Sequence, residues 1–390
     1  MKIGLLYLNE INYDDLAYVF VKNDIDCEII HTDISVNSID SQDAFKVAEL
    51  LRENGIDIAI TMDFCPAVSD ACENTNVMYI AWVYDAPQQA LYNRQITNSC
   101  NHIFSFDKNQ ASALKKLGAC DVIHFPLATN VYRNAGLVVN EGDEYRYGCD
   151  ISFIGNLYVD DYYDRIYERS CDATKKEMDE IIADSKGKWD GSNRIYGKLS
   201  EGAVSELTSL CGFNGNTDNK FAMDADEYLA SRLFSRKLAF LERTEISQMF
   251  SVYDFRLYTN SKDVNISGVD IWPALSYDEE LPKAYHLSKI NLNITLHSIT
   301  SGIPLRVFDI MGVGGFMMSN YQPEIEELFV VGKEIECYRD VGELEDKVRF
   351  YLEHEDARNN IALAGYKKVS EKYSYDVRFG EMMNHLGIRL

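Results

Sequence analysis

One stretch of this chain combines residue types that could bind a phosphate. Residues 292–320 read LNITLHSITSGIPLRVFDIMGVGGFMMSN, in which an apolar strand is predicted to lead into a polar loop, a helix that opens near Pro304, and a second strand from Phe316. A helix N-terminus offers free backbone N–H groups and a favourable dipole to an anion. The glycines could instead serve only to close a helix onto a strand.

Arg306 and Asp309 lie three positions apart on this predicted helix and therefore on neighbouring surface. Arg306 could contact a phosphate, and Asp309 could accept hydrogen bonds from ribose hydroxyls, because an ionised carboxylate has about four acceptor sites. In the alternative interpretation the two side chains form an ion pair with each other. The pattern thus predicts either a nucleotide-sugar site or a structural pair.

The elements before this stretch alternate in the manner of a parallel α/β unit. In the first 130 residues we predict strands at 2–8, 27–30, 57–61, 77–83, 102–106 and 122–125, and helices at 13–22, 44–54, 67–73 and 109–117. Gly118 stands where a C-cap glycine belongs. This order predicts right-handed crossovers with helices on both faces of one sheet.

A second α/β unit is predicted after a polar linker at residues 130–147. Its strands are expected at 150–154, 255–259, 269–272, 290–295, 316–319 and 334–338, with a helical insertion at about 160–250. The predicted fold class is α/β, with two Rossmann-like doubly wound domains facing a cleft. We place the domains at 1–146, joined by the C-terminal helix 373–390, and at 147–372.

Ligands of such sheets bind at the carboxyl ends of the strands, so the site should lie in the loops that follow strands. The candidate loops are residues 10–14, 63–66, 84–87, 107–109, 155–158, 297–303 and 320–323.

Composition excludes several classes of function. A net charge of −24 argues against nucleic acid or an anionic membrane surface as a partner. No apolar run approaches the ~18 residues of a transmembrane segment, and the run at 3–8 is too short for a signal peptide. The nine cysteines contain no Cys-x-x-Cys pair, and we find no metal-ligand spacing. We therefore expect a cytoplasmic protein with reduced thiols.

The motifs resemble those of glycosyltransferases of the GT-B fold, specifically the bacterial spore-maturation CgeB-like group. The matching pieces are SGIPLRVFDIMGVGGFMMSN, GKEIECYRD, KVRFYLEHEDARNNIALAGYKKV, YSYDVRF, YIAWVYDAP, IFSFDKNQASALKKLG and FPLAT. The resemblance implies sugar transfer from a nucleoside-diphosphate sugar, most simply a UDP-sugar, to a surface-associated protein such as flagellin or to a polysaccharide. It also implies a metal-independent reaction without other cofactors, leaning towards retention of the anomeric configuration.

The resemblance also implies roles for particular residues. Retaining relatives carry two glutamates separated by seven residues, and the matching positions here hold Ser301 and Asp309. Asp309 would bind the ribose, whereas Ser301 cannot replace a carboxylate near the sugar. The turn Gly155-Asn156 lacks the Arg and Lys of those relatives, which leaves Arg306 as the leading cation for the diphosphate.

The predicted catalytic residues are Asp85, His297 and Arg306. Asp85 could hold the acceptor or act as a base, or else cap the turn before Pro87. His297 could bond the sugar or phosphate, or else be a loop histidine with a structural partner. The predicted donor-binding residues are Gly155, Asn156, Ser301, Gly302, Arg306, Asp309, Tyr321, Gln322 and Glu334.

Two other classes of function remain open at this point. A sugar-nucleotide 2-epimerase of the same architecture would turn over the donor without an acceptor. A non-catalytic protein of a surface or spore assembly would keep the fold without the chemistry. Two departures from the relatives are compatible with it, namely Ser301 and Tyr84, since Tyr84-Asp85 stands where many relatives have a His-Asp pair.

Overall fold

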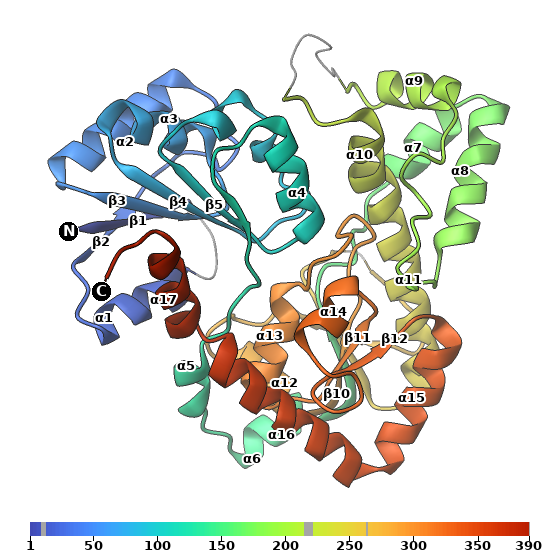
Figure 1. Cartoon of the computed structure of the whole chain (residues 1–390). Coiled ribbons are helices and arrows are strands. Elements are labelled where there is room, and N and C mark those ends of the chain that lie inside the picture. The colour runs from blue at the N-terminus through green and yellow to red at the C-terminus, as the bar shows by residue number, and fades with distance from the viewer. Residues whose placement is uncertain (9–12, 214–220, 263, 390) are drawn as a thin grey trace.

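A computed structural model describes residues 1–8, 13–213, 221–262 and 264–389 of the chain (Figure 1). The first sheet consists of β1 (Ile3–Tyr7), β2 (Cys27–His31), β3 (Ile58–Met62), β4 (Met78–Val83), β5 (Asn101–Ser105) and β6 (Val122–His124). All are parallel, in the order β2-β1-β3-β4-β5-β6. The continuous apolar burial of β3 is typical of a parallel strand covered on both faces.

Four helices connect these strands, namely α1 (Tyr13–Lys22), α2 (Ser41–Glu53), α3 (Pro66–Thr75) and α4 (Lys108–Leu117). Helix α4 is capped at both ends: the Asp107 carboxylate accepts from the Gln110 backbone N–H, and Gly118 adopts a left-handed φ of 99°. The strands and helices predicted for this region are confirmed, with small shifts at their ends.

The second sheet is also parallel and follows the order β12-β11-β10-β7-β8-β9. Its strands are β7 (Cys149–Ile154), β8 (Phe255–Thr259), β9 (Asp270–Pro273), β10 (Ser288–Asn293), β11 (Met317–Asn320) and β12 (Glu336–Tyr338). The strand order reverses between β7 and β10. The loops after these two strands therefore flank the crevice in which α/β sheets bind ligands.

The remaining helices of this unit are α12 (Glu280–Leu287), α13 (Leu305–Gly312), α14 (Pro323–Leu328), α15 (Val341–Glu353), α16 (Glu355–Lys372) and α17 (Tyr375–His385). Helix α17 returns to the first sheet and lies beside α1 (Figure 1). The rings of Phe20 and Phe379 are 5.0 Å apart, and Lys22 pairs with Asp376 at 3.1 Å. The two ends of the chain thus build one face of the N-terminal unit.

The predicted helical insertion is a small bundle with a core of its own. It comprises α7 (Tyr162–Arg169), α8 (Asp172–Ser185), α9 (Glu201–Leu210), α10 (Ala225–Leu229), a π-helical turn (Ala230–Phe234) and α11 (Ser235–Met249). Helices α7 and α8 are separate, because the chain is extended at Ser170 and Glu206 accepts from the Cys171 amide at 2.8 Å. Within the described ranges, no helix is long and apolar enough to cross a bilayer.

The segment predicted as a linker, residues 130–147, connects the two sheets and is helical. This segment forms α5 (Val131–Ala135) and α6 (Glu141–Tyr147). Asn130 and Asn140 cap the two helices, and Asn140 forms a reciprocal capping box with Asp143. The polar composition that suggested a linker reflects these caps and exposed helix faces.

Candidate functional site

A carboxylate of the N-terminal unit accepts hydrogen bonds from the backbone amides of Ser301 and Gly302, two residues that were predicted to bind the donor. Asp107 follows β5 and accepts hydrogen bonds from the Ser301 N–H at 3.0 Å and the Gly302 N–H at 2.9 Å. Asp107 is 2% exposed. A Cβ at Gly302 would lie 2.7 Å from the Phe106 ring, so the backbone approach requires glycine. These two amides hold the sheets together, and the expectation that they are free for a donor is wrong.

Neighbouring contacts close the same side of the cleft. The Asn109 amide donates to the Ser301 hydroxyl at 3.2 Å. Glu324 accepts from the Lys108 amide at 3.0 Å and lies 2.7 Å from the His124 ring nitrogen. Sequence analysis placed residues 107–109 in a ligand loop but could not show that their partners come from 200 residues further along the chain.

We predict that hydrogen exchange separates the two roles of Asp107. Replacement by alanine should speed exchange both at Ser301–Gly302 and in the first turn of α4, because the carboxylate serves both. Replacement by serine should speed exchange only at Ser301–Gly302, since serine still caps a helix but is too short to reach across the cleft. Unchanged protection of the Ser301 and Gly302 amides in both variants would contradict this assignment.

Two arginines converge on the turn after β7. Arg306 donates to the Asn293 side-chain oxygen at 2.7 Å, and its Nη2 lies 2.8 Å from where a Cβ on Gly155 would be. Arg243, from α11, donates to the backbone carbonyls of Asn156 and Ile294. Both guanidinium groups lie over the Phe153 ring, at 5.2 and 5.5 Å from its centre. Glycine at position 155 thus leaves room for the Arg306 guanidinium beside the turn.

Neither arginine has an acidic partner within ion-pair distance in the described part of the chain. Burial, followed by the charge of Arg306, lowers the pKa of Arg243 to about 10. Arg243 is 3% exposed, and its Nε has no hydrogen-bond partner. Arg243 was not among the predicted site residues. The cations were expected in the sequence of the glycine turn itself, whereas Arg243 comes from the helical insertion.

The turn after β7 offers fewer free backbone N–H groups to a ligand than predicted. The Gly155 N–H is bonded to the Tyr258 carbonyl at 3.0 Å and is not free for a ligand. The Asn156 side-chain oxygen accepts from the Ser261 hydroxyl at 3.3 Å. The positive charge at this turn therefore comes from the arginine side chains rather than from the Gly155 amide.

Asp309 lies in a buried polar cluster between the two units. It accepts from the Thr129 hydroxyl at 3.2 Å and the Tyr277 hydroxyl at 3.4 Å, and Tyr277 also contacts Asp15 at 3.0 Å. Arg133 pairs with Asp15 at 2.7 Å. Burial, followed by the Asp15 charge, raises the pKa of Asp309 to about 7. The alternative pairing of Arg306 with Asp309 is wrong.

Asp85 lines a cavity of about 270 Å³, here called the Asp85 pocket. Its walls come from both sheets and the insertion, and include Asp63, Tyr158, Arg232, Arg236, Leu296 and Ser298. The Asp63 carboxylate accepts from the Tyr84 and Asp85 amides at 2.8 and 3.2 Å, so Asp63 rather than Asp85 caps the turn before Pro87. Desolvation by the pocket walls raises the pKa of Asp85, and the Arg232 charge opposes this shift.

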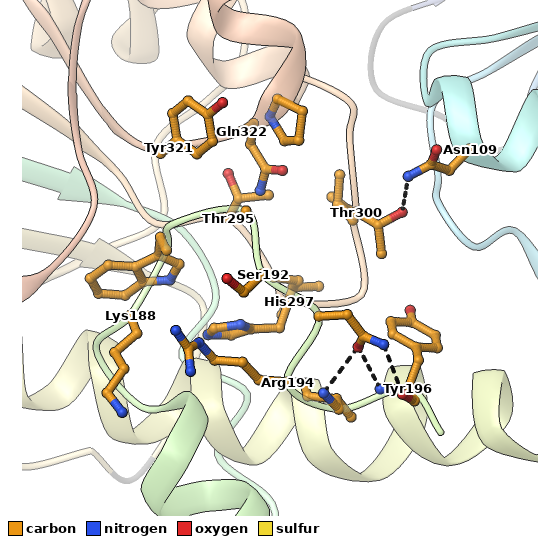
Figure 2. Close-up of a pocket in the computed structure, with 17 residues that line it drawn as sticks. Asn109, Lys188, Ser192, Arg194, Tyr196, Thr295, His297, Thr300, Tyr321 and Gln322 are labelled. Atoms are coloured by element: carbon orange, nitrogen blue, oxygen red, sulfur yellow. Dashed lines mark hydrogen bonds between the residues drawn. The ribbon is translucent and has the colours of Figure 1, made fainter. Parts of the chain in front are cut away.

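His297, Tyr321 and Gln322 line a separate cavity of about 200 Å³, here called the Trp189 pocket (Figure 2). The His297 ring nitrogen lies 2.8 Å from the Glu242 carboxylate. The ring also stacks near Trp189, with centres 6.3 Å apart. His297 thus has a structural partner, as the alternative interpretation proposed, and faces a pocket as well.

Two other sequence predictions, for Glu334 and for the loop 10–14, are not supported by contacts with these site residues. Glu334 precedes β12 and so lies at the amino end of that strand, away from the carboxyl ends that border the cleft, and its carboxylate accepts from the Val330 amide at 2.8 Å. Its predicted position near the donor is therefore wrong. In the candidate loop 10–14, residues 10–12 lie outside the described residues.

Comparisons with known proteins agree with this architecture. Residues 236–384, which include Arg243, Arg306 and Asp309, match the family described as "Glycosyl transferase-like". No curated protein sequence matches the chain.

Three solved structures share the fold at low identity. Sucrose-phosphate synthase (tll1590) from Thermosynechococcus elongatus is 8% identical, with 99% of each chain covered and a TM-score of 0.57. Anabaena Alr3699/HepE in complex with UDP and glucose is 10% identical, with 99% of each chain covered and a TM-score of 0.53. A candidate UDP-N-acetylglucosamine 2-epimerase from Listeria monocytogenes is 12% identical, covering 99% of this chain and 95% of that one, with a TM-score of 0.51. The predicted GT-B fold is thereby confirmed.

Proposed function

We propose that this GT-B fold chain, with its glycosyl transferase-like C-terminal part, transfers a sugar from a UDP-sugar to a surface-associated acceptor without a metal ion. The observation that carries the proposal is the pair of buried Arg243 and half-buried Arg306 at the turn after β7. The CgeB-like affiliation and the retaining outcome implied by the sequence belong to the same proposal, as does action in the cytoplasm.

The arginine pair is suited to a diphosphate. A buried charge is costly unless it is paired, and two adjacent guanidinium groups repel each other. This chain has a net charge of −24, yet the hydrogen bonds of both cations among the described residues go to neutral oxygens rather than to a carboxylate. Guanidinium groups form strong charge-assisted hydrogen bonds with phosphate oxygens. A diphosphate bound here would relieve the repulsion, and the arginines would stabilise the departing UDP.

Asp309 is the proposed ribose ligand. Its ionised carboxylate can accept hydrogen bonds from two adjacent hydroxyls. It lies one helical turn from Arg306 and at the boundary with the N-terminal unit, where Thr129 and Tyr277 hold it. A nucleoside diphosphate could therefore reach Asp309 and the arginine pair with neighbouring parts of one molecule.

Asp85 is the proposed acceptor-side residue. Tyr158 lines the Asp85 pocket and lies 5.2 Å from the Arg243 guanidinium, so the pocket adjoins the anion site. The acceptor oxygen would bond to the anomeric carbon on the same face from which the bond to the phosphate oxygen breaks, so that the configuration is retained, and Asp85 would take the hydroxyl proton. The Asp85 side chain is exposed to the pocket, and desolvation by the pocket walls raises its pKa, which favours proton uptake from the acceptor.

The direct test is calorimetric titration with UDP-glucose at pH 5.5 to 8.5. The phosphates of UDP-glucose do not change their ionisation in this range. We expect binding that survives EDTA and tightens with pH until about 7, because only ionised Asp309 accepts the ribose hydroxyls. Below that pH the affinity should fall by up to about tenfold per unit. Asp309→Asn should bind more weakly and without this pH dependence. Absence of binding at every pH would overturn the proposal.

A further inference from the structure

The Trp189 pocket is not used by the proposed donor site. It is formed by the loop 188–196 of the insertion, the loops after β10 and β11, and Asn109 of the N-terminal unit (Figure 2). The His297–Glu242 pair lies between this pocket and Arg243, the neighbour of Glu242 on α11. The pocket therefore requires a separate explanation.

The pocket combines aromatic surface with polar atoms that have no partner. Trp189 is 5% exposed, and its buried indole Nε1 has no hydrogen-bond acceptor in the part of the chain that the structure describes. Tyr196 and Tyr321 add ring surface. The Gln322 side chain lines the pocket, and no hydrogen bond to it occurs among the described residues. An occupant with both an apolar face and hydroxyl groups would satisfy these atoms.

The charges of the pocket are already neutralised. Arg194 pairs with Asp184 at 3.1 Å and with Asp190 at 2.6 Å, and Lys188 pairs with Asp184 at 3.3 Å. These cations are therefore engaged, in contrast to the arginine pair at the turn after β7. This arrangement favours an uncharged, hydroxyl-bearing ligand over a phosphate.

A third cavity joins this pocket to Asp85. It shares Asn109, Asn193, Tyr196 and Thr300 with the Trp189 pocket, and Ala86, Pro87 and Ser298 with the Asp85 pocket. A chain molecule could therefore place one end at Asp85 and the other at Trp189. The route runs between the insertion and the N-terminal unit.

We propose that the Trp189 pocket binds an uncharged sugar unit of the acceptor, so that the acceptor is a glycan rather than a bare protein side chain. The assignment of this sugar to the acceptor rests on the proposed function. The saccharide site itself rests only on the pocket.

Tryptophan fluorescence tests the proposal directly. The chain has three tryptophans, and Trp82 is fully buried in the N-terminal sheet. We would titrate the nucleotide-free protein with glucose, galactose, N-acetylglucosamine, rhamnose and maltose. At least one should produce a saturable change with a dissociation constant on the order of millimolar. Trp189→Phe should remove the fluorescence change, and the matched control Trp272→Phe should keep it.

Two further measurements separate a binding pocket from a structural cavity. Gln322→Ala should weaken the same sugar by roughly 2- to 10-fold, the effect of one hydrogen bond, while circular dichroism confirms that the variant is folded. Saturating UDP and saturating UDP-glucose should both leave sugar binding intact.

Two outcomes overturn the inference. If no sugar gives a saturable change, the pocket is not a saccharide site. If UDP-glucose displaces the sugar but UDP does not, the pocket holds the donor sugar and not the acceptor. Failure of the proposed function is distinguishable, because it would appear in the calorimetry as absent UDP-glucose binding while the sugar titration still succeeds.

Discussion

Arg306→Met is expected to weaken UDP-glucose binding by roughly 30- to 1000-fold, equivalent to about 2–4 kcal/mol. The variant removes a guanidinium that faces the turn after β7 without an acidic partner. The free protein should unfold at a nearly unchanged or higher temperature, because relief of the repulsion with buried Arg243 offsets the loss of the hydrogen bond to Asn293 and of the contact with the Phe153 ring. Calorimetry and thermal denaturation measure the two effects.

A matched control distinguishes this result from a general loss of positive charge. Arg349 lies on α15 and is exposed, paired with Glu345 at 3.2 Å. Arg349→Met should leave the affinity unchanged, because exposed ion pairs contribute little and this one lies outside the cleft. If Arg306→Met bound UDP-glucose as tightly as the parent, the anion site would be misplaced. If it bound less tightly only because it was unfolded, the denaturation curve would show it.

Asp85→Asn is expected to lower kcat for sugar transfer by about 10²- to 10⁴-fold with little effect on UDP-glucose affinity. Asparagine keeps the shape of the side chain but cannot take the proton from an acceptor hydroxyl. In the parent, transfer should slow as pH falls through the pKa of Asp85, which desolvation by the pocket walls raises from its ordinary value. Below that pKa the carboxylate is protonated and inactive as a base.

Asp224 provides the comparison for Asp85. It lines the connecting cavity rather than the Asp85 pocket. Asp224→Asn should therefore retain kcat within a few fold, and any loss should appear in the KM for the acceptor. Equal kcat values for Asp85→Asn and the parent would show that Asp85 neither takes the proton nor orients the reacting hydroxyl. The transfer reaction would then require another base.

Much of the fold was predictable, because local residue patterns determine where strands and helices form and which faces they bury. Apolar runs of strand length, such as the one that forms β3, must be buried on both faces, and only a parallel sheet with helices on both sides allows this. Gly118 and the helix-forming stretches set the ends of α4 in the same local manner. The loops at residues 84–87, 155–158 and 297–303 were predicted to reach the cleft because they follow strands, and they do.

The partners of the site residues were not predictable, because they are distant along the chain. Arg243 reaches Asn156 from 87 positions away, and Asp107 reaches Ser301 across 194. Asn130 shows that composition alone was also insufficient for local structure. A polar residue can stand in an irregular linker or cap a helix, and Asn130 caps α5.

The sequence by itself determined the element order, the parallel sheets and the residues Asp85, Arg306 and Asp309 as site candidates, since burial periodicity and strand ends are local properties. Only the tertiary structure decided which charges remain unpaired. In the folded chain, Arg194 and Lys188 pair with nearby aspartates, and Asp107 accepts hydrogen bonds from two backbone amides. Arg243 and Arg306 lie close together and have no carboxylate partner among the described residues. Electrostatic pairing depends on distance in space, and the folded chain alone sets that distance.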